Sequence, residues 1–243
     1  MNRKDGRKPK QIREITLIPR FIKTQASSIL IEMGNTRVLC TGTVDFKQPK
    51  WMGHDQKSGW VTAEYNMLPN SSLKRIKRER YGISGRTKEI QRIISRSVRA
   101  AVDLNQIGPI TIVLDCDVLE ADGGTRTASI TGAYVCLVFI LNKLKEVNNW
   151  SSLPLKGNLA AISIGKVDGE ILVDLNYEED SQAEVDCNIA ALSGGKIIET
   201  QATGEGGIFT KDDLNKMVDI ALNVMNILYK KQNDCLKEMG VEL

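Results

Sequence analysis

The chain has 243 residues, of which 42% are hydrophobic and 26% charged, as is typical of a globular protein with one sizeable core or two fused smaller ones. Its net charge of +3, from 33 basic and 30 acidic residues, is too small to indicate a nucleic-acid partner by itself. The single histidine, His54, argues against the usual zinc sites and against Ser-His or Cys-His nucleophiles, and we interpret it as a surface loop residue.

The cysteines indicate a reducing compartment. They form an odd set without a Cys-x-x-Cys pair, and most lie in apolar runs, where a thiol behaves as a small hydrophobic group: Cys40, Cys116, Cys136, Cys187 and Cys235. No apolar core follows the basic N-terminus, and the longest apolar stretch, residues 133–141, is too short to span a bilayer. We therefore expect a cytoplasmic protein with reduced, buried thiols and no membrane partner.

The first elements are strands, followed by a basic stretch. Residues 27–44 hold two β-rich runs around Gly34-Asn35, which predicts a hairpin, and residues 61–68 predict another strand. Basic residues then crowd residues 74–99, where a solvated helix face and a phosphate- or RNA-binding surface are both consistent with the pattern. The candidate RNA-binding residues are Lys74, Arg75, Lys77, Arg78, Arg80 and Arg92.

A helix and a buried strand come next. The helix is predicted to begin at Ser84 or Thr87, either of which can cap it, and to end near residues 104–108. Residues 110–118 are interpreted as a buried strand, and residues 128–147 as a helix so apolar at its centre that it must run through the core.

The second half starts with strands again. Residues 148–156 are the best candidate for a hinge, so we expect one domain with internal halves at residues 1–150 and 151–243. The predicted elements of the second half are strands at 159–167 and 170–175, a hairpin at 184–202 around Gly194-Gly195, and a helix from Thr210 to about Met239. This order predicts an α+β fold with two-layer packing and a loose similarity between the halves.

The junction between the predicted strand at 110–118 and the core helix has the features of a phosphate-binding turn. Gly123 and Gly124 allow close approach of the backbone to an anion, and Thr125, Arg126 and Thr127 offer hydroxyl and guanidinium donors at a helix N-terminus. A plain strand-to-helix connection is the alternative. Four acidic residues precede the turn, so we expect a metal or a basic side chain to balance them: Asp115, Asp117, Glu120 and Asp122.

The second acidic segment, residues 176–186, carries the other candidate for chemistry. Asp180 and Asp186 would share a face of a continuous strand but stand roughly 20 Å apart, so joint action requires the chain to reverse between them, with Ser181 and Gln182 as plausible turn residues. Carboxylates without histidine suit Mg²⁺ or Mn²⁺, and one carboxyl could act as a general acid. A solvated acidic turn is the alternative.

Six sequence blocks are spread along nearly the whole chain: 34–40 (GNTRVLC), 59–65 (GWVTAEY), 85–92 (GRTKEIQR), 114–119 (LDCDVL), 121–132 (ADGGTRTASITG) and 177–181 (YEEDS). In this order they resemble the ribonuclease PH family of phosphorolytic 3′ to 5′ exoribonucleases. The resemblance implies an α+β two-layer sandwich of two similar halves, of the ribosomal-protein domain-2-like type, assembled as a homohexamer built from three dimers.

The resemblance also implies roles for individual residues. Gly124, Thr125 and Arg126 would hold the attacking inorganic phosphate, and Arg86 would grip phosphate or the terminal RNA linkage. Asp180 and Asp186 would be the catalytic carboxylates, binding Mg²⁺ or protonating the leaving 3′ oxygen. The implied reaction removes 3′-terminal nucleotides from RNA, chiefly tRNA precursors, as nucleoside diphosphates, and its reverse adds nucleotides.

Three alternatives remain open from the sequence. A ring subunit of the exosome type that binds RNA without catalysis is the first, and the presence of Thr125, Arg126, Asp180 and Asp186 argues against it. The second is a polynucleotide phosphorylase-like protein. The third is a metabolic enzyme for a small phosphorylated substrate, which the basic stretch and the lack of a P-loop signature make less attractive.

Overall fold

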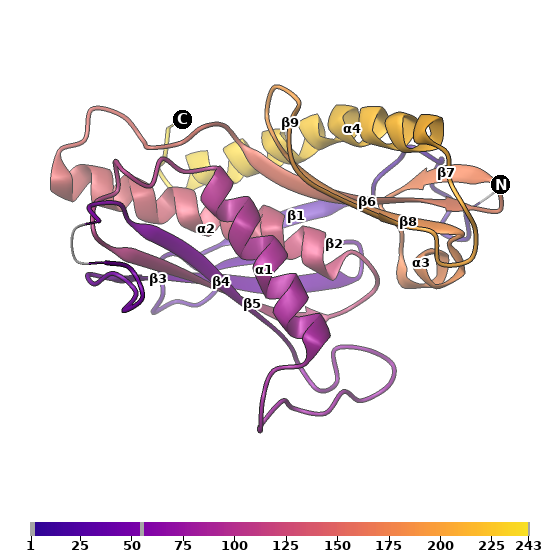
Figure 1. Ribbon diagram of the computed structural model, residues 1–243, viewed down its shortest axis with the longest axis horizontal. Helices are drawn as coiled ribbons and strands as arrows, with labels where there is room; N and C mark the ends of the chain where they lie inside the picture. Colours follow the sequence, from indigo (N-terminus) through magenta and orange to yellow (C-terminus); the bar gives the residue numbers. More distant parts are fainter. Residues whose placement is uncertain (1–2, 54–55, 243) are drawn as a thin grey trace.

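The computed structural model describes residues 3–53 and 56–242, and the predicted loop residue His54 lies outside them. The strands are β1 (Ile15–Pro19), β2 (Ile29–Met33), β3 (Thr36–Asp45), β4 (Trp60–Met67), β5 (Thr111–Glu120), β6 (Leu159–Val167), β7 (Glu170–Val173), β8 (Val185–Leu192) and β9 (Lys196–Thr203). The helices are α1 (Gly85–Ala100), α2 (Thr125–Asn148), α3 (Tyr177–Gln182) and α4 (Lys211–Glu238) (Figure 1).

The first half forms a five-stranded sheet in the order β1-β2-β3-β5-β4, in which only β4 and β5 pair in parallel. The predicted hairpin is β2 and β3, with Gly34 in the left-handed conformation at the turn (φ 57°). Strand β1 was not predicted from the sequence. It is a short edge strand of five residues, and its pairing with β2 identifies it.

Helix α1 covers the free edge of β4. Side chains on one face of the helix satisfy the main-chain groups that a further strand would otherwise pair: Gln91 donates to the carbonyl of Tyr65, Ser95 bonds both main-chain groups of Ala63, and Arg99 donates to the carbonyl of Val61. The hydroxyl of Ser84 caps α1 by accepting from the N–H of Thr87. The helix ends at Ala100, before the predicted residues 104–108, because Val102 forms a bridge with Leu155.

The second half forms an antiparallel sheet in the order β7-β6-β8-β9. Its hairpin β8–β9 and its long helix α4 are as predicted, and Thr210 and Asp213 cap α4 reciprocally. The predicted hinge is residues 148–156, of which residue 148 is the last of α2 and residues 149–156 contain no helix or named strand. This segment is tied to the region after α1 by main-chain hydrogen bonds from Asp103 to Pro154 and from Lys156 to Ala101.

Helix α2 joins the halves, because it packs on β2, β3 and β5 of the first sheet and on β6 and β8 of the second. In the described chain, α2 is the one helix long and apolar enough to cross a membrane, but 89% of its apolar window is buried inside the protein. Its surface therefore builds the core, as its sequence predicts. All five cysteines are free and buried, also as predicted. The observed architecture confirms the α+β fold of two sheet-and-helix layers.

Candidate active site

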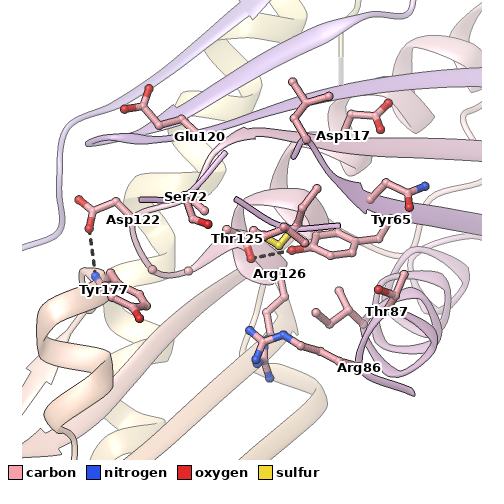
Figure 2. Close-up of a pocket in the computed structure, with 18 of the residues that line it drawn as sticks. Tyr65, Ser72, Arg86, Thr87, Asp117, Glu120, Asp122, Thr125, Arg126 and Tyr177 are labelled. Atoms are coloured by element: carbon pink, nitrogen blue, oxygen red, sulfur yellow. Dashed lines mark hydrogen bonds between the residues drawn. The ribbon is translucent and has the colours of Figure 1, made fainter. Parts of the chain in front are cut away.

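A cleft of about 1180 Å³ lies where the two halves meet, and both halves supply its walls. The first half contributes Tyr65, the start of α1, the loop before it and the turn into α2; the second contributes α3 and the start of β8 (Figure 2). The cleft brings together all six residues that the sequence predicts for catalysis and phosphate binding: Arg86, Gly124, Thr125, Arg126, Asp180 and Asp186.

The predicted phosphate turn has the expected backbone. Gly123 and Gly124 both adopt the left-handed conformation (φ 73° and 68°), and α2 starts at Thr125 immediately after them. Gly124 occupies the N-cap position and has no side chain to cap the helix, so the first N–H groups of α2 are available to an anion. At Gly123 a Cβ atom would lie 2.5 Å from the carbonyl oxygen of Leu175, which shows how tightly the turn packs against the second half.

A tyrosine that sequence analysis did not select supports the turn. The Tyr65 hydroxyl lies 2.9 Å from Thr125 Oγ1, from the side of the parallel strand β4 (Figure 2). Burial raises the pKa of Tyr65, so the phenol keeps its proton at neutral pH. When Tyr65 donates to Thr125 Oγ1, the Thr125 hydroxyl proton is free to bond an anion.

Two guanidinium groups extend into the cleft. Arg86 lies in the first turn of α1, and Arg126 lies in the first turn of α2; Figure 2 shows their side chains reaching toward the same part of the cleft. Arg126 Nη1 donates to Gln201 Oε1 on β9 at 2.9 Å, and Gln201 Nε2 donates to Glu89 Oε1 on α1 at 2.7 Å. The two cations form the positively charged side of the cleft.

The carboxylates Asp180 and Asp186 form its acidic side. The chain reverses between them as the sequence requires, because Asp180 lies on the short helix α3, which includes Ser181 and Gln182, and Asp186 lies near the start of β8. Burial raises the pKa of Asp180, against the influence of Arg126. Burial and the neighbouring Asp180 raise the pKa of Asp186 to about 6, while the Asn188 amide donates to both Asp186 oxygens at 3.3 and 3.2 Å.

Helix α3 is held in place by a capping box at its N-terminus and by an arginine of the N-terminal segment. Asn176 caps the helix by accepting from the N–H of Glu179, whose carboxylate accepts in return from the N–H of Asn176. The same carboxylate binds Arg3 from the N-terminal segment through two hydrogen bonds of 2.7 and 2.6 Å. Because Arg3 is buried, this pair fixes α3, and with it Asp180, against the rest of the chain.

A second arginine of the N-terminal segment holds the backbone of the turn. Arg13 donates to the main-chain carbonyls of Asp122 and Gly123 and to the fully buried carboxylate of Asp174. The Asp122 carboxylate itself accepts from the N–H of Tyr177 (Figure 2). Arg13 thus holds the backbone of the turn, but among the described ion pairs its partner is Asp174, so a cation that balances the four acidic residues before the turn remains a prediction.

Asp115 and Asp117 lie outside that arrangement, on the face of β5 next to Glu64 of β4. Burial and the charge of Glu64 raise the pKa of both carboxyls, and Asp117 adds to the effect on Asp115. Asp117 and Glu120 line the cleft, whereas Asp115 does not.

The basic stretch contributes to the cleft in part. Four of the six candidate RNA-binding residues line it, all exposed: Lys74, Lys77, Arg78 and Arg80. Arg75 and Arg92 are exposed but do not line it.

Metal ligands are few in this region. Among residues 3–53 and 56–242, no group of three or more His, Cys, Asp or Glu side chains is arranged to hold a metal ion. The pair Asp180 and Asp186 offers two hard oxygen ligands whose mutual repulsion a divalent cation would relieve, so the donor set fits Mg²⁺.

Both halves of the chain match models of one protein family. Residues 11–139 match the model of the 3′ exoribonuclease family, domain 1, and residues 157–224 match domain 2. The chain belongs to the ribonuclease PH family. Proteins named Ribonuclease PH from Mycobacterium bovis and Mycobacterium tuberculosis are 48% identical over 96% of this chain and 91% of their own.

The solved structures agree with this family membership at the level of the fold. A chain of the Archaeoglobus fulgidus exosome with RNA bound to the active site has a TM-score of 0.78 at 22% identity, over 95% of this chain and 92% of its own. Rice Rrp46 has a TM-score of 0.75 at 18% identity, over 96% of this chain and 100% of its own. The ribonuclease PH fold is thus shared with proteins of very different sequence.

Proposed function

We propose that this chain is a phosphorolytic 3′ to 5′ exoribonuclease, a nucleotidyltransferase that releases nucleoside diphosphates from RNA 3′ ends. The observation that carries the proposal is the cleft itself, which combines an anion-binding turn, two arginines and a pair of carboxylates in a member of the ribonuclease PH family. Of the described residues that line it, none is Cys or His. In this proposal the attacking atom is an oxygen of inorganic phosphate, which the anion-binding turn and the two arginines would hold.

The residues divide the reaction between them. The N–H groups of the turn, the hydroxyl of Thr125 and the guanidinium groups of Arg86 and Arg126 hold the phosphate and the scissile diester, whose negative charges would otherwise repel each other. A phosphate oxygen forms a bond to the terminal phosphorus, the bond from phosphorus to the 3′ oxygen of the preceding nucleotide breaks, and that oxygen takes up a proton. The products are a nucleoside diphosphate and an RNA shorter by one nucleotide.

Asp180 and Asp186 occupy the side of the cleft where the leaving oxygen gains its proton in this scheme. Burial and mutual repulsion make Asp186 the more easily protonated, with its pKa raised to about 6. In the alternative role, the two carboxylates are ionised and would hold Mg²⁺, which would stabilise the negative charge that develops on the phosphoryl oxygens.

We further propose tRNA precursors, trimmed toward the CCA end, as the main substrates, with other RNA 3′ ends as additional ones and nucleotide addition as the reverse reaction. The exposed residues Lys74, Lys77, Arg78 and Arg80 support this proposal, because their charges lie at the wall of the cleft where the RNA backbone would enter. Assembly as a homohexamer of three dimers and a cytoplasmic location are part of the same proposal.

The test is a phosphate-dependence assay. Purified protein is incubated with a tRNA that carries extra 3′ nucleotides, with and without phosphate and Mg²⁺, and the products are separated by chromatography. Nucleoside diphosphates should appear only when both are present. Release of nucleoside monophosphates without phosphate would rule out phosphorolysis, and RNA binding without turnover would favour the non-catalytic ring subunit.

Two variants connect the assay to the cleft. Arg126→Ala should impair the use of phosphate and leave RNA binding largely intact, whereas Asp180→Asn should abolish turnover. Full activity of either variant would show that the site is misplaced.

A further inference from the structure

A chain of three side chains links the cleft to the interface between α1 and β9. Arg126 lines the cleft and donates to Gln201 Oε1, and Gln201 Nε2 donates to Glu89 Oε1. Gln201 and Glu89 do not line the cleft. Through hydrogen bonds these two residues can therefore reach a bound anion only by way of Arg126, whereas the charge of Glu89 also acts through space.

The hydrogen-bonding groups of Arg126 and Glu89 determine how the Gln201 amide is oriented between them. A guanidinium group has no acceptor and an ionised carboxylate has no donor, so the amide of Gln201 must turn its oxygen to Arg126 and its nitrogen to Glu89. Glu89 thus holds the Gln201 amide in the one orientation that serves Arg126. This orientation restricts a long and flexible arginine side chain before an anion arrives.

A neutral partner also leaves the charge of Arg126 available. A carboxylate in direct contact with Arg126 would compete with an anionic ligand for the same guanidinium group. The amide oxygen orients the guanidinium without adding a full negative charge, and the carboxylate of Glu89 stays one residue away.

We propose that Gln201 is a positioning residue that orients Arg126 for inorganic phosphate, and that Glu89 acts through Gln201. The proposal rests on the proposed function, because phosphate is the anion assigned to Arg126. It extends the site from the turn to the strand β9 and the helix α1, which approach each other across the two halves.

The same interface contains a matched control. Arg96 of α1 pairs with Glu199 of β9 at 2.6 Å, and neither residue lines the cleft or contacts Arg126 through a hydrogen bond among the described residues. The Gln201–Glu89 hydrogen bond and the Glu199–Arg96 ion pair connect the same two faces. Residues 199 and 201 lie on one side of β9, and residues 89 and 96 lie on one side of α1. Glu199→Gln therefore weakens the tether between α1 and β9 without disturbing the orientation of Arg126.

The experiment compares Gln201→Met, Glu89→Met, Glu89→Gln, the double variant Gln201→Met/Glu89→Met, and Glu199→Gln. Inorganic phosphate is titrated into each protein by calorimetry, and KM for phosphate, KM for RNA and kcat are measured separately. Gln201→Met has a similar shape but no hydrogen-bonding group, and should raise Kd and KM for phosphate about tenfold with KM for RNA within twofold of the wild type. Glu89→Met should show a smaller rise in the same direction.

Glu89→Gln keeps an acceptor for Gln201 and should stay within twofold of the wild type, as should Glu199→Gln. The double variant should raise Kd and KM for phosphate no further than Gln201→Met does, because the hydrogen-bonded route is already broken and removal of the Glu89 charge cannot weaken binding of an anion. Wild-type phosphate affinity in Gln201→Met would overturn the inference, as would an equal rise in Glu199→Gln.

The remaining outcomes of the experiment also test the inference. If Gln201→Met does not fold, as judged by circular dichroism, the pair Glu89→Met and Glu89→Gln carries the test, and equal phosphate affinities in the two variants would overturn the inference. Phosphate binding by the wild type together with an unaffected Gln201→Met would refute the positioning role alone. Absence of phosphate binding and of phosphate-dependent turnover in the wild type would refute the proposed function and the inference together.

Discussion

Arg13 and Asp174 form a buried, two-point ion pair between the N-terminal segment and the second half. Arg13 Nη2 lies 2.6 Å from Asp174 Oδ1, and Arg13 Nε lies 3.0 Å from Asp174 Oδ2. Arg7 approaches the same carboxylate, at 3.4 Å, and the N–H of Arg13 also donates to it at 2.7 Å. Because Arg13 also binds the carbonyls of the turn, the pair connects the phosphate-binding turn to the segment that leads into α3.

We expect Asp174→Asn to lower the free energy of unfolding by about 3–5 kcal/mol, because it leaves buried guanidinium groups without their counter-charge. Backbone strain does not confound the comparison, since asparagine tolerates the left-handed conformation found at Asp174 (φ 54°). Urea denaturation measures the change. The control is Glu146→Gln, which breaks an exposed pair with Lys143 and should cost less than about 1 kcal/mol; equal losses in both variants would contradict the prediction.

Tyr65→Phe removes the hydroxyl that bonds Thr125 Oγ1. The Thr125 hydroxyl then loses the donor that orients it, so KM for phosphate should rise about three- to tenfold while the melting temperature changes little. Steady-state kinetics at varied phosphate concentration measure the effect. Tyr134→Phe, which removes a hydroxyl that bonds the carbonyl of Gly157, serves as the control and should leave KM for phosphate unchanged; a rise of equal size there would argue against the orienting role.

Gly123→Ala tests the close approach of the turn to the second half. The new Cβ would lie 2.5 Å from the Leu175 carbonyl oxygen in a residue with φ 73°, so the turn must shift and turnover should fall at least tenfold. Gly169→Ala is a matched control, because its φ of 77° is similar but no atom lies within 4 Å of the added Cβ. The control should lose about 1–2 kcal/mol of stability from backbone strain alone and keep its activity. Similar activities of the two variants would show that the contact with Leu175 is unimportant.

Asp115→Asn should increase stability at neutral pH. Burial, Glu64 and Asp117 raise the pKa of Asp115 in the folded protein, so the folded state binds a proton more readily than the unfolded state does. The favourable contribution of the protonated form is present below about pH 4, the unfolded pKa, and is lost as pH rises through the raised folded pKa.

At pH 7 the free energy of unfolding of Asp115→Asn should therefore exceed that of the wild type. The increase should be less than about 1 kcal/mol, since Asp115 is partly exposed and its interactions are screened. Urea denaturation at pH 7 and pH 3 measures the difference. A gain of the same size at pH 3 would contradict the electrostatic explanation.

Local chemistry made much of the fold predictable. The glycine turns at Gly34 and at Gly194-Gly195, and the caps at Ser84 and Thr210, determine nearby backbone conformation through the residues themselves. The same holds for the phosphate turn, where consecutive glycines precede donor side chains. The residue types at these positions predict a turn or a helix cap without knowledge of distant contacts, and the structure contains these turns and caps.

The unpredicted parts depend on partners that are distant in sequence. Strand β1 is defined by its pairing with β2, and Gln201 is selected by contacts with Arg126 and Glu89 from two other elements. Nothing in the sequence around Gln201 distinguishes it from an ordinary exposed residue of a hairpin. Tyr65 lies in a recognisable block, but its role depends on a hydrogen bond to Thr125, and Arg75 and Arg92 resemble their basic neighbours without lining the cleft.

The N-terminal arginines also govern the order in which the cleft can be completed during synthesis. Arg3 is synthesised before its partner Glu179, which follows 176 positions later. Arg13 likewise precedes its partner Asp174, which lies 161 positions later in the sequence. A growing chain that ends after α2 has the phosphate turn but neither the carboxylates nor the anchor of α3. The cleft is therefore incomplete until residue 186 has been added, and its completion depends on contacts between residues more than 160 positions apart.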